Sequence, residues 1–227
     1  MAALRGTTDA LDVHIQTRVA PRANHEDADL IIRLPPPLAG RRSPPASAWP
    51  SFAAFLNWLP QLVAELAVAD LRVRGGAHLS AAYALGAALP STSGRAITVL
   101  DPQGRPWGLS TVAGPVALRV EQESLPGPHG ATAVFVDLVG TPQPVDSFGS
   151  HIRDGRLLCS HAIRIAQVSS APIPSAAGAA TALEVASRIR SFAAEARTAK
   201  LDLFLRTPFP LAVLLGCSLN TLEVCLY

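Results

Sequence analysis

The spacing of apolar residues predicts that strands and helices alternate along most of the chain. Apolar and polar positions alternate from Leu11 to Val19, which is typical of a half-buried strand. Residues 35–50 are rich in proline and predict a long surface loop. An apolar face at helical spacing then runs from Phe52 to Leu66, with Ser51 in position to cap its start. Because proline lacks the backbone N–H, we expect Pro60 to kink or split this helix.

The second half of the chain repeats this alternation. Ala131 to Val139 predicts a buried central strand, and Leu157 to Gln167 predicts another strand. An alanine-rich helix is expected from Ala176 to Ala199, followed by a strand from Leu201 to Leu205. Strands that alternate with helices in this way indicate an α/β fold.

One motif occurs twice at a constant offset. The pattern Ala-x-x-Leu-Gly-x-x-Leu spans Ala82 to Leu89 and returns, 130 residues later, at Ala212 to Leu219. Each copy follows a short strand, beginning at Leu71 or Leu201, and precedes another strand. The repeat predicts a duplicated α/β unit, and we expect the small residues of each motif to let its helix approach its own sheet closely. We interpret Gly75-Gly76 as the tight turn of the first copy.

Composition and charge narrow the classes of partner. Apolar residues make up 49% of the chain, which is ample for a packed core. Nineteen basic and 17 acidic side chains give a formal charge of only +2, so we expect no duplex nucleic-acid partner.

The cysteines and the apolar runs of the sequence indicate the cellular compartment of the protein. Cys159, Cys217 and Cys225 are odd in number and lie in apolar surroundings, which predicts reduced thiols. No signal-peptide pattern follows Arg5, and the longest apolar run, Thr207 to Leu222, contains prolines and is shorter than the ~20 residues that span a bilayer. We therefore expect a cytoplasmic protein with no membrane insertion.

Motifs for catalysis or metal binding are weak. The glycines do not have the spacing of a P-loop. His151, Cys159 and His161 lack the paired spacing of zinc sites, and Ser160-His161 is not part of a Gly-x-Ser-x-Gly pattern. We expect no catalytic residue, no metal and no cofactor.

The turns that follow the two repeated strands form the candidate ligand site. Parallel strands present their carboxyl ends at one edge of a sheet, and the helices that start there offer unpaired N–H groups to anions. We therefore expect the two turns to face one shared cleft. The residues predicted to bind a ligand are Arg74, Gly75, Gly76, His78, Leu79, Ser80, Trp107, Arg206, Thr207, Pro208 and Phe209.

Alternatives stay open for several of these residues. His78 is equally compatible with a solvated helix cap, and Phe209 fits a core position better than a base-stacking platform. Trp107 fits a hydrophobic plug as well as a cleft wall. Arg206 is the strongest single candidate, because its only acidic neighbour in sequence is Asp202.

The two copies together resemble the SAVED domain, a fusion of two CARF-like halves. The resemblance is carried by the segment Leu201 to Gly216 with Val224 to Tyr227, and by Gly76 to Gly86 followed by Asp101 to Trp107. It implies two pseudo-symmetric Rossmann-like (CARF-like) lobes with parallel-rich sheets flanked by helices. Residues 1–227 would then form one SAVED-like domain, with 10–125 as its first half and 130–227 as its second.

The resemblance also implies a function. SAVED domains are sensors of cyclic oligonucleotide second messengers, such as cyclic tri- or tetra-adenylates, in the CBASS and type III CRISPR branches of bacterial anti-phage defence. The implied partners are an effector domain or protein (nuclease, TIR, protease or membrane effector) and further copies of the chain in a head-to-tail oligomer. We expect the chain itself to be a sensor without catalysis. A Rossmann-like nucleotide-processing enzyme, for example a phosphodiesterase that cleaves a cyclic oligonucleotide, and an interaction module without ligand are the alternatives.

Overall fold

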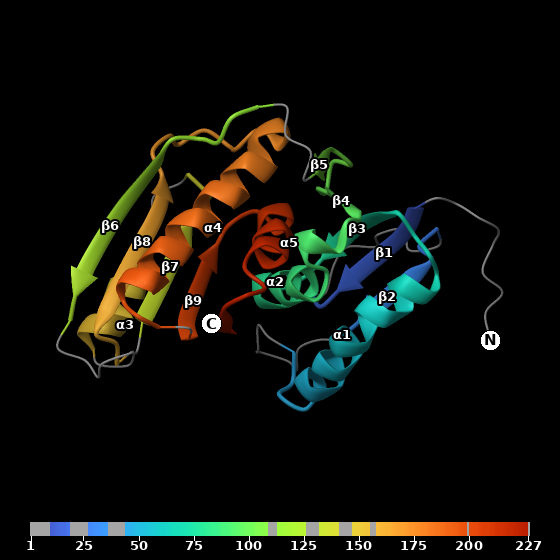
Figure 1. Ribbon diagram of the computed structural model, residues 1–227, viewed down its shortest axis with the longest axis horizontal. Helices are drawn as coiled ribbons and strands as arrows, with labels where there is room; N and C mark the ends of the chain where they lie inside the picture. Colours follow the sequence, from blue (N-terminus) through green and yellow to red (C-terminus); the bar gives the residue numbers. More distant parts are fainter. Residues whose placement is uncertain are drawn as a thin grey trace.

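Two five-stranded sheets organise the chain, each with helices packed on it (Figure 1). The computed structural model describes residues 10–18, 27–35, 44–108, 113–125, 132–140, 147–154, 158–198 and 200–226. The predicted α/β fold with parallel-rich sheets is confirmed, since in each sheet four strands are mutually parallel and one edge strand is antiparallel.

The first sheet has the order β2-β1-β3-β4-β5. Its elements along the chain are β1 (Ala10–Gln16), β2 (Leu30–Arg33), α1 (Ala48–Glu65), β3 (Asp70–Gly76), α2 (Leu79–Ala88), the 3-10 turn η1 (Ser91–Ser93), β4 (Ala96–Leu100) and β5 (Pro106–Gly108). Alternate residues of the strands, such as Leu11, Val13 and Ile15 in β1, are buried in one core with the apolar faces of α1 and α2. The period-two pattern therefore buries one face of this sheet under the helices.

The second sheet has the order β10-β9-β7-β8-β6. Its elements are β6 (Leu118–Ser124), β7 (Thr132–Asp137), α3 (Ser147–Arg153), β8 (His161–Gln167), the 3-10 turn η2 (Ser175–Ala177), α4 (Gly178–Glu195), β9 (Lys200–Arg206), α5 (Phe209–Ser218) and β10 (Glu223–Leu226). All residues of β7 are buried, as expected for a central parallel strand with both faces covered. The helices α4 and α5 pack on one face, and Phe148 of α3 packs on the other face against Phe135 and Phe204.

The predicted duplication is confirmed residue by residue. The elements α1, β3 and α2 begin and end 130 residues before α4, β9 and α5, respectively. Even an irregularity repeats, because Ala67 and Arg197 follow α1 and α4 with positive φ angles of 50° and 51°. The strand exits match too, since Thr17 N–H donates to Gly76 O at 3.2 Å and Leu138 N–H donates to Arg206 O at 2.8 Å.

The two halves meet where α2 packs against α5. A Cβ atom added to Gly86 would lie 2.0 Å from the carbonyl oxygen of Val213, and one added to Gly216 would lie 2.1 Å from that of Tyr83. The glycines of the repeated motif thus let the two helices cross in close contact, rather than bringing each helix close to its sheet as the sequence suggested. The α2–α5 pair lies inside one core that contains residues of both halves.

Prolines in the first half disturb the structure less than predicted. The helix α1 begins at Ala48 rather than after Ser51, and Pro50 lies in its first turn, where backbone N–H groups have no helical partner. The helix continues through Pro60, whose ring is exposed, so it is not split. Of the predicted loop, residues 36–43 lie outside the described part of the chain.

Several boundaries in the second half differ from those predicted. The strand β8 begins at His161 rather than at Leu157, which lies outside the described residues, and α4 is shorter than the expected helix at both ends. The strand β6 was not predicted, and it pairs with β8 of the second sheet. Residues 118–124, which the sequence assigned to the first half, therefore belong to the second sheet.

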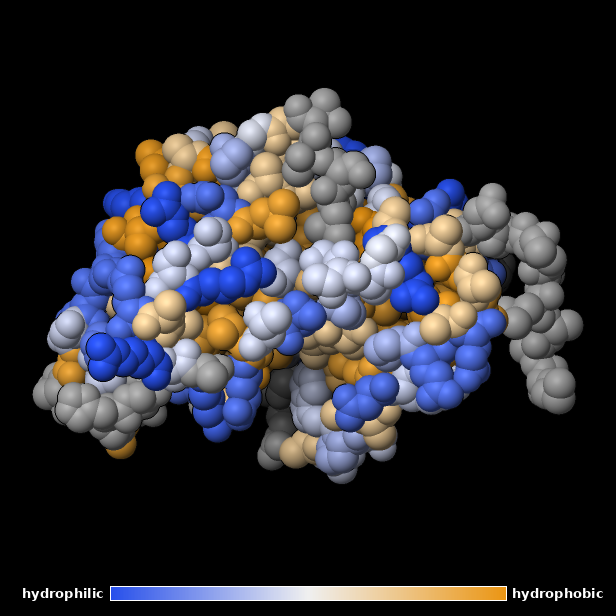
Figure 2. Space-filling view, viewed as in Figure 1, coloured by the Kyte–Doolittle hydropathy of each residue, from blue (hydrophilic) through white to orange (hydrophobic). Residues whose placement is uncertain are grey.

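The face of the molecule shown in Figure 2 mixes polar and apolar residues. None of the helices in the described ranges combines the length and the apolarity needed to cross a bilayer. Cys159 and Cys217 are buried free thiols and Cys225 is a half-buried one; burial raises the pKa of Cys217 to about 12.

Candidate ligand-binding site

The carboxyl ends of β3 and β9, together with the starts of α2 and α5, hold the predicted site residues other than Trp107. In both halves the residue before the helix is extended, with φ −61° and ψ 146° at His78 and φ −55° and ψ 144° at Pro208. The two helix starts therefore have the same backbone conformation, and each leaves its first N–H groups without a helical partner, although Pro210 removes one such donor from α5. That the two exits share one cleft stays a prediction.

The first strand exit depends on glycine. Gly75 has a φ of +136°, and a Cβ atom there would lie 2.0 Å from the carbonyl oxygen of Ile15 in β1. Only glycine fits this close approach. Gly75 and Gly76 are thus the last residues of β3 rather than a tight turn, and Gly76 O accepts the N–H groups of Thr17 and Arg18, each at 3.2 Å.

His78 is held by a threonine from the neighbouring strand exit. Its backbone N–H donates to Thr17 Oγ1 at 2.7 Å, and its Nδ1 lies 2.8 Å from the same oxygen. One hydroxyl can accept the N–H and donate its own hydrogen to Nδ1. Thr17 is 1% exposed, so the hydrogen bonds anchor the imidazole at the start of α2, while His78 itself is half-buried. Leu79 and Ser80 are half-buried in the first helical turn.

Arg74 lies on the other side of the first sheet. It pairs in register with His14, and both residues are on the sheet face opposite to the core that contains Val73. The guanidinium Nε is buried and makes no hydrogen bond with the rest of the described chain. Arg74 is therefore separated by the sheet from the helix α2 that it was predicted to accompany.

Arg206 forms an ion pair that the sequence did not reveal. Its Nη1 lies 2.9 Å and 3.1 Å from the two carboxylate oxygens of Asp137, and Arg164 Nη2 is 3.5 Å from the same carboxylate. The parallel register of β7 and β9 places Asp137 directly beside Arg206. Asp202 is the acidic neighbour of Arg206 in sequence, but strand pairing adds Asp137, which is 69 positions away.

The guanidinium groups around Asp137 are partly accessible. The side chains of Arg206 and Arg164 are 22% and 26% exposed, whereas that of Asp137 is 9% exposed. Arg164 also lies over the Phe135 ring, 5.4 Å from its centroid. One signal could have revealed Asp137: it is the charged residue that ends the apolar run 132–136, so it marks the carboxyl end of a buried strand.

The remaining residues of the second exit are more enclosed. Thr207 is 5% exposed, and its Oγ1 has no hydrogen-bond partner in the described chain. Pro208 precedes α5, and Phe209 is half-buried against the main core, in keeping with its core alternative. The threonine hydroxyl is therefore a buried polar group at a helix start that still lacks a partner.

Trp107 lies between the two halves. It is 4% exposed in β5, and its ring packs on Gly178 at the start of α4, where a Cβ atom would be 2.4 Å from the tryptophan Cε3. Its Nε1 lies 3.4 Å from Asp101 Oδ2. Burial opposes ionisation of Asp101, but hydrogen bonds from Arg105, Trp107 and Gln103 outweigh burial and lower the carboxyl pKa. This position fits the hydrophobic plug rather than a cleft wall.

The arrangement offers donors for an anion rather than a reactive nucleophile. Within the described ranges, no group of three or more His, Cys, Asp or Glu side chains is placed to hold a metal ion. His161 Nδ1 lies 2.9 Å from the hydroxyl of the adjacent Ser160. The neighbouring Cys159 is buried, and burial, followed by the charges of Asp202 and Glu123, raises the pKa of its thiol, which disfavours the reactive thiolate.

Solved structures with the same fold cover nearly the whole chain. A Cap4 SAVED/CARF-domain containing receptor from Acinetobacter baumannii matches in complexes with the cyclic trinucleotides 3'3'3'-cAAA (TM-score 0.68) and 2'3'3'-cAAA (TM-score 0.69); each match has 18% identity over 96% of this chain and 48% of that one. The Moraxella osloensis Cap4 receptor matches with a TM-score of 0.63 and 18% identity, over 97% of this chain and 47% of that one. The chain thus spans about half the length of these receptors.

The family follows from the sequence match. A search of curated protein sequences found no match. A family model for the SMODS-associated and fused to various effectors sensor domain, SAVED, matches residues 55–227, which is most of the chain. Its fold agrees with the two-sheet arrangement described above. The resemblance predicted from the repeated motifs is confirmed, and the chain belongs to the SAVED family of sensor domains.

Proposed function

We propose that this chain is the sensor of a receptor for a cyclic oligonucleotide second messenger, such as a cyclic tri- or tetra-adenylate. The observation that carries the proposal is the fold match over 96% of the chain to receptors solved with cyclic tri-adenylates. Membership of a family of sensor domains supports it. A cyclic oligonucleotide is anionic, which suits a site that combines helix starts with a guanidinium group.

The two strand exits supply different contacts to such a ligand. At the first exit, the imidazole of His78, oriented by Thr17, and the N–H groups of α2 would bind phosphate or base. At the second exit, Arg206 would bind phosphate while Asp137 holds its guanidinium in place, and the buried hydroxyl of Thr207 would gain the partner that it lacks. The proposed binding residues are Arg74, Gly75, Gly76, His78, Leu79, Ser80, Trp107, Arg206, Thr207, Pro208 and Phe209, of which Arg74 and Trp107 have the weakest support because of where they lie.

Ligand binding would activate an effector in anti-phage defence through assembly of copies of the chain. The receptors with the same fold are about twice as long as this chain. The part of such a receptor that this chain does not match is long enough to hold an effector. Head-to-tail contacts between two similar but non-identical halves would extend into a ring or filament. Light scattering with saturating cyclic tri-adenylate should report assembly, and a species that stays monomeric would contradict this part of the proposal.

Calorimetric titration with a panel of cyclic di-, tri- and tetranucleotides tests the binding proposal. Charge-assisted hydrogen bonds contribute about 1.5–3 kcal/mol, so Arg206→Ala should weaken binding about ten- to hundredfold. Arg188→Ala is the matched control, because Arg188 is an exposed arginine paired with Glu184 on α4. Unchanged affinity in folded Arg206→Ala would remove Arg206 from the site, and absence of binding to every member of the panel would contradict the sensor function.

Recovery of the ligand after incubation separates the sensor from its enzymatic rival. A sensor returns the cyclic oligonucleotide intact, whereas a phosphodiesterase returns linear products. Chromatography of the recovered nucleotide distinguishes the two outcomes.

A further inference from the structure

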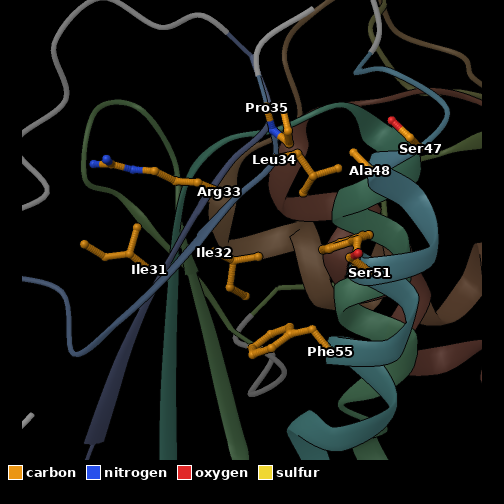
Figure 3. Close-up of a pocket in the computed structure, with 10 residues that line it drawn as sticks. Ile31, Ile32, Arg33, Leu34, Pro35, Ser47, Ala48, Ser51 and Phe55 are labelled. Carbon is orange, nitrogen blue, oxygen red and sulfur yellow. The ribbon is translucent and has the colours of Figure 1, made fainter. Parts of the chain in front are cut away.

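A pocket of about 410 Å³ lies beside β2, at the start of α1 (Figure 3). Its walls are mainly apolar: Ile32 and Leu34 point toward the helix, which contributes Phe52 and Phe55. Ser47 and Ser51 line the pocket at the first turns of α1. This volume is within the range of about 300–1,000 Å³ that is typical of ligand sites.

The second half contains the counterpart of this pocket, and there it is filled. At the constant offset of 130 residues, Ala48 corresponds to Gly178 and Ser51 to Thr181. The Trp107 ring packs directly on Gly178, and the backbone N–H of Val116 donates to Thr181 Oγ1 at 3.2 Å. The chain that joins the two halves thus covers the start of α4 with an aromatic ring and a peptide hydrogen bond.

The start of α1 has the same framework with different walls. Phe52 and Phe55 replace Ala182 and Val185, so the first half fills part of the space with its own rings. The pocket that is left keeps a hydroxyl, that of the exposed Ser51, where Thr181 accepts the peptide N–H. Ser51 thus offers a hydroxyl acceptor at the place of Thr181, but Ala48 carries the Cβ atom that Gly178 lacks. A ring on α1 would therefore lie further from the helix backbone, against Phe52 and Phe55.

We infer that this pocket binds an aromatic side chain carried by an extended segment of another polypeptide. The occupied counterpart shows the chemistry, a ring against the helix start and a peptide N–H on the hydroxyl. A phosphorylated ligand fits less well, because among the described residues that line the pocket only Arg33 is charged, and its guanidinium points away from α1 (Figure 3). Recognition of an extended segment through side-chain pockets and backbone hydrogen bonds is a recurring mode of peptide binding.

The test uses the full chain and N-acetyl-L-tryptophanamide as the probe, followed by amide NMR shifts. A compact ligand of this size that uses its surface well has a Kd on the order of 0.1 mM, so the titration extends about a hundredfold above that value. We expect saturable shifts at residues 31–35 and 47–55. The variant Ser51→Trp should abolish them by filling the pocket, and Ala53→Trp, exposed on the opposite side of α1, should not.

Two further probes identify the source of the ring. N-acetyl-L-leucinamide lacks an aromatic ring and should cause no saturable shift at these residues, and adenosine should bind more weakly than the tryptophan amide. Absence of saturable shifts with the tryptophan amide would overturn the inference. So would stronger binding of adenosine, which would assign the pocket to a nucleobase, or retained binding in folded Ser51→Trp.

Discussion

The two halves of this chain share the helix pairs α1/α4 and α2/α5 but differ in the side-chain chemistry of their strand exits. In the first half, hydrogen bonds between Thr17 and His78 fix the exit. In the second half, Asp137 fixes it by binding Arg206 and Arg164. The helices of the repeat keep an offset of 130 residues without insertion or deletion, and the exits keep one backbone hydrogen bond, whereas the side-chain contacts at the exits differ. Packing thus constrains both halves equally, and the differences gather where a ligand is expected to bind.

The outer faces of the two sheets differ in the same way. Phe135 in β7, which α3 covers with Phe148 at a ring distance of 5.1 Å, corresponds in strand register to His14 in β1. The neighbours of His14 on that face include Arg72 and Arg74, where the second sheet has Asp202 and Phe204. A duplicated framework has therefore acquired an aromatic cluster on one copy and a group of polar side chains, with His14 buried among them, on the other.

The largest effect is expected where the halves are joined. Trp107→Ala removes the buried ring of β5 that packs on the start of α4, and deletion of a buried tryptophan side chain costs about 3–5 kcal/mol. Urea denaturation should report this loss. Trp58→Ala is the control, because Trp58 is 46% exposed and should cost about 1 kcal/mol or less. Equal losses of unfolding free energy for the two variants would show that the Trp107 ring does not stabilise the contact between the halves.

The next effect tests the symmetry of the helix crossing. Gly86→Ala and Gly216→Ala each place a methyl group against the backbone of the other helix, which should cost about 2–3 kcal/mol. Thermal or urea unfolding should give losses for the two variants that agree within about 0.5 kcal/mol. Gly114→Ala meets no atom within 4 Å and should be neutral. A large loss in only one of the two variants would break the equivalence of the halves.

A smaller effect separates the two exits. Asp137→Ala leaves two half-buried guanidinium groups without their carboxylate, which should cost about 1–3 kcal/mol after allowance for their solvent exposure. Gln16→Ala, at the corresponding place in β1, should cost about 0.5 kcal/mol, since the amide is neutral and half-buried. The urea midpoints of Asp137→Ala and Gln16→Ala measure how much each exit depends on its side chain. Equal midpoints would show that the two exits do not differ in this respect.

The smallest effect sharpens the description of the first exit. Thr17→Val keeps the shape of the side chain but leaves the backbone N–H and Nδ1 of His78 without the hydroxyl, at a cost of about 1 kcal/mol. Thr17→Ser should restore most of the stability. The unfolding midpoints of Thr17→Val and Thr17→Ser show whether the hydroxyl stabilises this exit. A serine variant as unstable as the valine variant would indicate that packing, rather than hydrogen bonding, matters there.

Sequence periodicity predicted the elements that have one clear apolar face. The strand β1 and the helical face of α1 that contains Phe52 and Leu59 follow from local spacing alone. The strand β6 was missed because most of its side chains are exposed, so it has no apolar alternation to detect. The start of α1 was misplaced because a proline in a first turn looks like a helix breaker in sequence.

The site was harder to predict than the fold, for a physical reason. Its residues could be placed at strand exits from the motif, but their partners depend on strand register. Thr17 and Asp137 lie 61 and 69 positions from His78 and Arg206, and only the pairing of neighbouring parallel strands brings them together. Trp107 fills its place against Gly178 through the same kind of non-local contact.

The crossing of α2 and α5 has the form of a homodimer interface. Gly86 meets the backbone at Val213, and Gly216 meets it at the corresponding Tyr83, so each side repeats the contact of the other. Such reciprocity is the rule for an isologous contact between identical subunits. In a dimer of identical chains, a mutation changes both sides at once; in a fused chain, each side can change alone. Gene fusion would thus have allowed the two strand exits to evolve separately. The crossing, which needs a residue without a Cβ atom on both sides, would have stayed symmetric.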